Sequence, residues 1–167
     1  PVFCDVDYNT QNVTAECIKP VFSLRTKAIM VVHYAGLSVD VEEINRFGVP
    51  VIEDCAHAVD TWKDGVHAGA MGDIGVFSFD SMKNLSCGEG AAISASSPSF
   101  IEKVKRLRYC GISKSGVAAM ESGKKNRWWE TQVECYSLRH MPKDILASVA
   151  IAQLRKLDKM QEVRKKI

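Results

Sequence analysis

The feature that most constrains the fold is the alternation of short apolar runs with helix-type segments over residues 1–53. Weak helical spacing runs through TAECIKPVF (14–22) and again through VEEINRF (41–47). Three runs between and around them are predicted strands: PVFCDV (1–6), KAIMVV (27–32) and PVIE (50–53). Because such alternation with short connections is typical of parallel strands joined by crossovers, the sequence predicts an α/β fold. We expect a mostly parallel sheet that is flanked by helices.

Local signals extend this prediction along the chain. Asp40 with Glu43 resembles a capping box at the start of the second helix, and Gly48 supplies its stop. The Lys-Asp-Gly turn in TWKDGVHAG (61–69) predicts a hairpin. The remaining expected elements are strands at 74–79 and 91–94, a helix at 99–111, a long polar loop at 112–140, and a final helix that begins near Lys143 or Asp144.

The composition is that of an ordinary globular protein, with 46% hydrophobic and 25% charged residues. A formal net charge of +2 is too small to indicate nucleic-acid or membrane binding. No apolar run approaches the roughly 18 residues of a membrane span, and no signal peptide opens the chain. The six cysteines form no C-x-x-C pair, which argues against a zinc site and a disulfide framework. We therefore expect reduced thiols in a cytoplasmic protein without a metal.

The two ends indicate a piece of a longer protein. Residue 1 is proline, and PVFCDV already resembles a strand in progress. The last stretch, LASVAIAQLRKLDKMQEVRKKI (146–167), resembles a long helix without a stop signal. We expect a chain that is truncated at both ends.

Two ionisable residues follow predicted strands. Asp54 comes directly after PVIE, and Lys83 lies four residues past FSF (77–79). In an open parallel sheet, ligands collect outside the carboxyl ends of the strands. An acid and an amine at one sheet edge, with Ser78 beside them, are the parts needed to hold pyridoxal phosphate. The amine forms a Schiff base with its aldehyde, the carboxylate pairs with its pyridine nitrogen, and the serine with nearby backbone N–H groups suits its phosphate.

Each of these residues also has an ordinary structural interpretation. A lysine after a strand, such as Lys83, is usually a solvated loop residue, and Asp54 has the position of a helix cap or turn former. His57 alone is more often a satisfied polar residue than a ligand or base. Gly88 and Gly90 form only a G-x-G, which is stronger evidence for a turn than for phosphate binding. From the residues alone, the sequence predicts an α/β domain in which a Schiff-base site is one of two open interpretations.

Read together, several segments resemble the DegT/StrS family of pyridoxal-phosphate sugar aminotransferases, which have the fold of the aspartate aminotransferase superfamily. The two specific segments are IEDCAHA and the pattern FSFxxxKNxxxxEG. The other matching segments are PVFCDVD, TKAIMVVHYAG, the stretch through GVHAGAMGDIG, RLRYCGIS and DILASVAIAQLRKLDKMQEVRKKI. They lie in the family's order and cover nearly the whole chain. His33 and Tyr34 match a family segment near the cofactor, without an assigned role.

The resemblance implies a role for five residues. Lys83 would be the Schiff-base lysine and, once released, the base that moves the proton in transamination. Asp54 would bind the pyridinium nitrogen, and His57 would lie against the cofactor ring and its phenolic oxygen. Ser78 would donate to the phosphate. Arg139 occupies the place where the family often has an asparagine that reaches the neighbouring subunit's phosphate, and arginine suits a phosphate.

The resemblance also implies an activity, partners and a domain. We expect residues 1–167 to form a single partial domain, the middle of the cofactor-binding large domain, without the small C-terminal domain. The implied enzyme is a homodimer with shared active sites. It would transfer an amino group, typically from glutamate, to a keto-sugar nucleotide in cell-surface polysaccharide biosynthesis.

Two other functions stay open. One is a dehydratase of the same family, although its relatives replace the lysine with histidine, so Lys83 counts against it. The other is a non-catalytic fragment that keeps the fold. The segment GKKNRWW (123–129) fits either a contact with the substrate diphosphate or a solvated loop.

Overall fold

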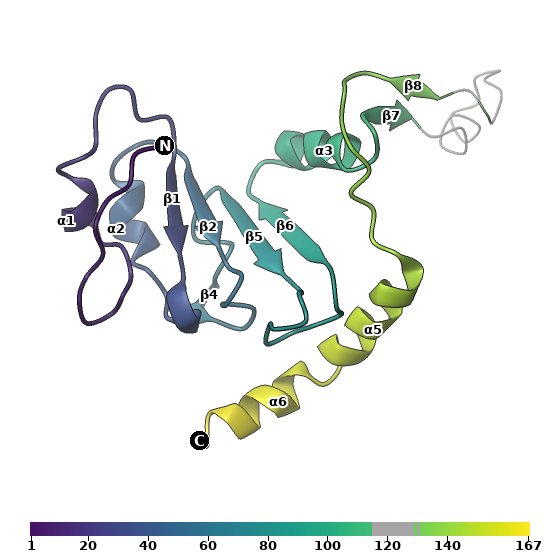
Figure 1. The fold of residues 1–167 in the computed structure, drawn as a ribbon. Coiled ribbons are helices and arrows are strands. Elements are labelled where there is room, and N and C mark those ends of the chain that lie inside the picture. Colours follow the sequence, from purple (N-terminus) through teal and green to yellow (C-terminus); the bar gives the residue numbers. More distant parts are fainter. Residues whose placement is uncertain (115–128, 130) are drawn as a thin grey trace. The chain divides into compact units, whose positions relative to one another are not determined.

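The computed structural model describes residues 1–114, 129 and 131–167 of the chain. The chain forms two compact units, one made of Pro1–Ser96 with Asp144–Ile167 and the other of Ser97–Lys143. The first unit contains a four-stranded sheet, drawn in purple to teal in Figure 1. Because every predicted site residue except Arg139 belongs to this unit, its sheet decides where the candidate site lies.

The sheet is mixed, with mostly parallel strands, as the sequence predicts. Its strands are β1 (Ile29–Val32), β2 (Val51–Asp54), β5 (Ile74–Ser78) and β6 (Ala91–Ala95), in the spatial order β1-β2-β5-β6. The first three strands are parallel, and β6 runs antiparallel to β5 (Figure 1). The register places Val32 opposite Asp54 and Asp54 opposite Val76. The carboxyl ends of β1, β2 and β5 therefore meet at one edge.

Two short helices cover one face of β1 and β2. They are α1 (Ala15–Ile18) and α2 (Val41–Asn45), and both lie beside these strands in Figure 1. The buried side chains that pack together are Val13, Ile18, Ile29, Val31, Val39, Val41, Ile44 and Val51. The predicted cap is confirmed, because the Asp40 side chain accepts a hydrogen bond from the Glu43 N–H at 3.1 Å. The apolar alternation of the strands thus explains which face is covered.

The predicted hairpin is also confirmed. Strands β3 (Trp62–Lys63) and β4 (Val66–His67) pair antiparallel, with Asp64 and Gly65 at φ values of 51° and 78°. Two consecutive residues with positive φ are typical of the type I′ turn that matches the twist of a hairpin. After β4, residues 68–73 lead back to the sheet and into β5.

A contact between two glycines lets this segment lie against β5. A Cβ atom on Gly75 would lie 2.4 Å from the Gly69 Cα atom and 2.5 Å from the Ser94 Oγ atom. No real side chain tolerates such distances, so only glycine fits at position 75 in this packing. The Ser94 hydroxyl donates to the Gly69 carbonyl and holds the segment to β6 as well.

The predicted strand at residues 1–6 is wrong. This segment forms no ladder with any described strand, and the side chains of Val2 and Phe3 are exposed. Local bonds form a turn next to it instead: the Asp7 N–H donates to the Asn12 carbonyl, and the Gln11 N–H donates to the Asp7 carbonyl, both at 2.9 Å. An apolar run becomes a strand only beside a partner, and this run has none in the described part of the chain.

The long final helix is divided in two. Helix α5 (Asp144–Leu154) and helix α6 (Leu157–Arg164) are separated by a tightened turn, where the Lys156 N–H donates to the Gln153 carbonyl at 3.0 Å. This bond spans three residues rather than four, so the regular ladder stops there. Among the described residues, no helix has the length and apolar character that crossing a membrane requires.

The second unit differs from the predicted long loop. Helix α3 (Pro98–Leu107) is followed by β7 (Ile112–Lys114) and β8 (Gln132–Val133), which pair antiparallel. The ends of the expected loop are thus tied together as a two-stranded sheet. Most of the GKKNRWW segment lies outside the described residues.

Candidate functional site

Asp54 ends β2 with its carboxylate on the partly open face of the sheet. Its Oδ1 atom accepts a hydrogen bond from the Ala56 N–H at 2.9 Å, which shapes the turn after the strand. Its Oδ2 atom has no hydrogen-bond partner within the described part of the chain. The side chain is half-buried. Asp54 is thus a turn former, as its ordinary structural interpretation predicts, and it also has a carboxylate oxygen that is available to a ligand.

Ser78 ends the neighbouring strand β5 at the same edge. Because Asp54 is in register with Val76 and Ser78 lies two residues beyond, the Cα atoms of Asp54 and Ser78 are about 8 Å apart by standard strand spacings. The Ser78 Oγ atom accepts a long hydrogen bond of 3.4 Å from the Asp80 N–H. The predicted meeting of acid and hydroxyl at one sheet edge is therefore present in the fold.

Lys83 lies in the loop of residues 79–90, which connects β5 to β6. The loop is closed at its base by the Phe79 N–H, which donates to the Gly90 carbonyl at 2.8 Å. The buried side chains of Leu85 and Cys87 anchor it. The Lys83 N–H donates to the Asp80 carbonyl at 3.0 Å, so a local turn sets its backbone. The loop therefore holds Lys83 on an ordered turn.

The Lys83 ammonium makes no hydrogen bond and no salt bridge with any described residue. The Met82 N–H bond, followed by the Ser81 N–H bond and the nearby Lys83 charge, holds the pKa of Asp80 below its ordinary value. The Lys83 side chain is only half-buried. An amine with this exposure and no carboxylate partner is available for bonding to a ligand.

His57 lies in the turn that follows β2, and its side chain is exposed. Its ring centroid is 6.1 Å from that of Tyr34, which begins the short 3₁₀ helix η1 (Tyr34–Gly36) after β1. A Cβ atom on Gly36 would lie 3.1 Å from the His57 carbonyl, so the two turns approach closely. The turn after β1 thus forms one side of the His57 position.

Arg139 belongs to the second compact unit. Its backbone forms an isolated antiparallel bridge with Tyr109, and its side chain is exposed. The other four residues belong to the first unit, and the phosphate role of Arg139 stays a prediction.

Sequence reasoning missed a buried pair beneath this edge, formed by His33 and Glu53. Both side chains are fully buried, and the His33 Nε2 atom lies 2.9 Å from the Glu53 Oε2 atom. Glu53 also accepts hydrogen bonds from the N–H groups of Gly69, Met71 and Gly72, at 2.9, 2.9 and 2.6 Å. One signal was available: Glu53 has the same strand parity as Val51, which puts a charged residue on the core face.

The hydrogen bonds of Glu53 decide its charge state. Burial alone would raise the pKa of this carboxyl, but the bond from His33 and the bonds from the Gly72 and Gly69 N–H groups outweigh burial. They hold the pKa of Glu53 below its ordinary value. Glu53 is therefore a buried carboxylate that is stabilised by hydrogen-bond donors.

Cys55 completes a group of three potential metal ligands with His33 and Glu53, whose ligand atoms lie within 4.8 Å of one another. Burial, followed by the nearby carboxylates Glu53 and Asp54, raises the pKa of the Cys55 thiol to about 12. A protonated thiol is a poor metal ligand, and both carboxylate oxygens already accept two hydrogen bonds each. The arrangement thus fits a hydrogen-bond network better than a metal centre.

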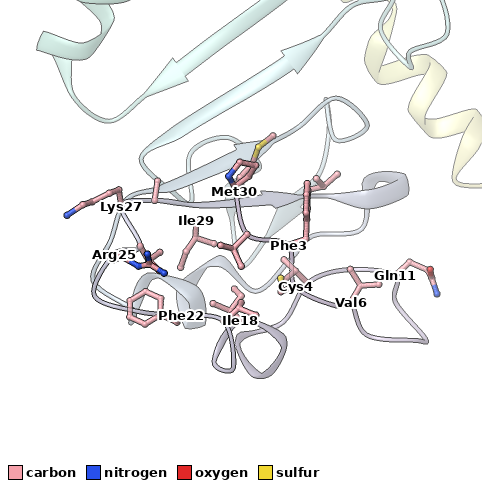
Figure 2. Close-up of a pocket in the computed structure, with 17 residues that line it drawn as sticks. Phe3, Cys4, Val6, Gln11, Ile18, Phe22, Arg25, Lys27, Ile29 and Met30 are labelled. Carbon is pink, nitrogen blue, oxygen red and sulfur yellow. The ribbon is translucent and has the colours of Figure 1, made fainter.

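A cavity of about 750 Å³ lies elsewhere in the first unit. Figure 2 shows that the N-terminal segment, α1 and β1 line it, with Phe3, Ile18, Phe22 and Met30 among the lining side chains. None of the five predicted site residues lines this cavity. The candidate site at the strand edge is therefore separate from this cavity.

Several solved structures with a similar fold are aminotransferases. The aminotransferase TlmJ from Streptoalloteichus hindustanus is 36% identical, with a TM-score of 0.82 over 95% of this chain and 41% of that one. An aminotransferase from Psychrobacter cryohalolentis is 30% identical, with a TM-score of 0.83 over 93% and 40%. Helicobacter pylori PseC, an aminotransferase involved in the biosynthesis of pseudoaminic acid, is 26% identical, with a TM-score of 0.82 over 95% and 40%.

These matches define the class as aminotransferases with a pyridoxal-phosphate fold. The chain belongs to the DegT/DnrJ/EryC1/StrS aminotransferase family, whose model matches residues 1–167. The resemblance seen in the sequence is thus confirmed. Aminotransferases of this family use pyridoxal phosphate. The chain spans about 40% of the length of the solved relatives named above.

The donor groups on the strand edge and on the loop after β5 are of the types that fit this cofactor. Asp54 has a carboxylate oxygen without a hydrogen-bond partner in the described residues, as binding of a pyridinium N–H requires. Lys83 offers an amine outside any described salt bridge, and Ser78 offers a hydroxyl. These three groups match the nitrogen, aldehyde and phosphate of pyridoxal phosphate.

Proposed function

We propose that this chain is the cofactor-binding part of an aminotransferase that moves an amino group from an amino acid to a keto-sugar nucleotide. The observation that supports this proposal most directly is the strand edge that carries Asp54 and Ser78, followed by Lys83, whose ammonium has no hydrogen-bond or salt-bridge partner among the described residues. A protein that only bound sugars would have no use for a reactive amine at this place. Family membership supports the same reaction type.

Each side chain has a distinct task in this proposal. Bound pyridoxal phosphate would supply an electron sink for the carbon that loses a proton. Asp54 would hold the cofactor ring through its nitrogen and keep that nitrogen protonated. Lys83 would hold the aldehyde carbon and, when released, would move the proton at the reacting carbon through its Nζ atom. Ser78 would bind the phosphate, and His57 would lie against the ring and its phenolic oxygen.

The remaining parts of the proposal concern the whole protein. We propose residues 1–167 as a single partial domain, the middle of a large domain, in a cytoplasmic homodimer with shared active sites. Arg139 would serve the phosphate of the neighbouring subunit. Glutamate is the proposed donor, and cell-surface polysaccharide biosynthesis is the proposed setting.

The direct test of the cofactor site is chemical labelling. The chain is mixed with pyridoxal phosphate, reduced with borohydride and mapped by peptide mass spectrometry. We expect a pyridoxyl group on Lys83 and none in Lys83→Arg, which keeps the charge but has no reactive amine. Lys103→Arg is the matched control, because Lys103 is exposed on α3, and it should label Lys83 as the wild type does. Labelling spread evenly over exposed lysines would contradict the proposal.

A second experiment tests the reaction. The chain with bound pyridoxal phosphate is incubated with ¹⁵N-glutamate and a 3-keto- or 4-keto-hexose nucleotide. Transfer of ¹⁵N to the sugar supports an aminotransferase. Loss of a sugar hydroxyl without ¹⁵N transfer would contradict the aminotransferase proposal and support the dehydratase alternative.

A further inference from the structure

His33 forms hydrogen bonds with Asp54 and with Glu53, the residue before it. Its backbone N–H donates to the Asp54 carbonyl at 3.1 Å, which continues the β1–β2 ladder by one residue. Its side chain binds the carboxylate of Glu53, the preceding residue, at 2.9 Å. Because its exposed fraction is 0%, water does not compete for these bonds. One residue thus fixes the main chain immediately around Asp54.

The hydrogen bonds also determine the His33 tautomer. The Val39 N–H donates to the Nδ1 atom at 3.1 Å, so Nδ1 has its lone pair toward Val39. The proton of the neutral ring is therefore on Nε2, from which it is donated to Glu53. Both ring nitrogens have a defined partner, and a leucine or phenylalanine here would leave the Val39 N–H and a carboxylate oxygen with one partner fewer.

The same residue shapes the turn against which His57 lies. The His33 carbonyl accepts a bond from the Gly36 N–H at 3.1 Å, and its Nδ1 atom holds Val39 at the far side of the turn. The Gly36 carbonyl in turn accepts the Thr61 hydroxyl at 2.7 Å, just beyond the His57 turn. His33 is therefore joined by short links to two predicted cofactor contacts, Asp54 and His57.

Glu53, the hydrogen-bond partner of His33, connects this pair to β5. Through the N–H groups of Gly69, Met71 and Gly72, the Glu53 carboxylate fixes the segment that leads into β5. Strand β5 ends at Ser78. The buried pair thus ties together the ends of β1 and β2 and the start of β5, which are the elements that carry the candidate site.

We propose that His33 is a positioning residue for cofactor binding: through the neutral Nε2–H tautomer and Glu53, it sets the positions of Asp54 and of the turn beside His57. This inference rests on the proposed function, because it concerns how the cofactor ring is held. His33 does not touch the cofactor in this role. It acts through Asp54 and the turn of residues 34–39.

The test separates the two side-chain bonds. His33→Leu removes both; His33→Gln keeps a donor at the Nε2 position toward Glu53; His33→Asn keeps an acceptor at the Nδ1 position toward Val39. Val41→Ala is the control, because Val41 is a buried residue of the same core on α2 and has no bond to Asp54 or His57. For each variant, urea unfolding gives the stability, and titration with pyridoxal phosphate gives the Kd and the absorbance maximum of the bound cofactor.

We expect His33→Leu to raise the Kd for pyridoxal phosphate by about tenfold or more and to shift the absorbance maximum. Val41→Ala should be less stable than the wild type but should keep the wild-type Kd and absorbance spectrum. His33→Gln should recover most of the affinity, and His33→Asn should recover less. If His33→Leu does not fold, the Kd values and spectra of His33→Gln and His33→Asn are compared with those of Val41→Ala. That comparison then tests the positioning role.

Equal Kd values and spectra in the His33 variants and Val41→Ala would overturn the positioning role and leave the proposed function standing. Absence of pyridoxal phosphate uptake by the folded wild type would overturn the proposed function, and this inference with it.

Discussion

Glu53 and Asp54 are consecutive in β2, yet their carboxylates lie on opposite faces of the strand and meet opposite environments. From the described residues, the fully buried Glu53 accepts four hydrogen bonds, whereas the half-buried Asp54 accepts one, from the Ala56 N–H. The pleat of the strand causes this separation, because successive side chains point to opposite faces. One acid therefore holds the sheet edge together, and its neighbour has an oxygen left for a ligand.

Replacing Glu53 with glutamine should be strongly destabilising, although the two side chains have nearly the same shape. All four groups that bind the Glu53 oxygens are donors, from His33, Gly69, Met71 and Gly72. A glutamine amide would direct its own N–H₂ against two of them. We expect a loss of about 2–4 kcal/mol in the free energy of unfolding, measured in urea.

The matched control for this change is Glu42→Gln. The Glu42 side chain is 88% exposed, and its salt bridge with Arg46 is long, at 3.7 Å. It should lose no more than about 0.5 kcal/mol. Similar losses of stability in Glu53→Gln and Glu42→Gln would contradict the hydrogen bonds described around Glu53.

The stability of the fold should fall on acidification, and Glu53 should contribute to the fall. Its folded pKa lies below the ordinary value of about 4.3. The stabilisation is therefore fully present above that value and is lost as the pH falls through the lower folded pKa. Urea unfolding in steps from pH 6 to pH 3 should show the stability gap between wild type and Glu53→Gln narrowing toward acid. A constant gap over this range would contradict the assignment.

Two substitutions at Asp54 should separate its turn-forming role from its charge. Asp54→Asn keeps an oxygen for the Ala56 N–H, so its stability should stay near that of the wild type. Without the negative charge, it should bind pyridoxal phosphate about 10- to 100-fold more weakly, as loss of a hydrogen bond to a charged group implies. Asp54→Ala should lose both stability and affinity. Equal affinity of wild type and Asp54→Asn would remove Asp54 from the proposed site.

Short-range signals explain most of what the sequence predicted correctly about the fold. The cap at Asp40 and the turn at Asp64 and Gly65 depend on neighbouring residues, so their patterns were sufficient. The segment at residues 1–6 was predicted wrongly because a strand needs a partner, and apolar composition does not show whether one is present. The division of the last helix near Lys156 likewise has no Pro or Gly to mark it.

For the candidate site too, the sequence showed local features but not long-range contacts. Residue pattern and family resemblance named Asp54, Ser78 and Lys83, because strand ends are visible in the sequence; their roles remain predictions. The partners of Glu53 depend on how the segment of residues 68–73 returns against β5, which is a long-range contact. No local pattern predicts that contact, and therefore the buried pair with His33 emerged only from the fold.

Thiol reactivity should follow burial among the cysteines. Cys55 is buried with a pKa raised to about 12, so almost no thiolate exists at pH 8. Cys135 is exposed. Brief treatment with iodoacetamide at pH 8, followed by mass mapping, should label Cys135 and leave Cys55 unlabelled, whereas treatment in urea should label both. Early labelling of Cys55 in the folded protein would show that the network around Glu53 opens readily.

The glycine contact beneath the candidate site gives the sharpest test of the packing. In Gly75→Ala, the new Cβ atom would meet the Gly69 Cα atom at 2.4 Å and the Ser94 Oγ atom at 2.5 Å. One obstacle is backbone and the other is a small side chain, so the segment of residues 68–73 must move. We expect a loss of about 1–3 kcal/mol in urea unfolding. Because this segment donates three N–H groups to Glu53, its displacement should also weaken pyridoxal phosphate binding. The double variant Gly75→Ala with Ser94→Ala removes the side-chain obstacle, although it also removes the Ser94 hydrogen bond to the Gly69 carbonyl, and the backbone obstacle at Gly69 stays. It should therefore recover part of the stability at most, and not the affinity. Full recovery of both would show that Ser94, and not the approach of Gly69, determines the fit.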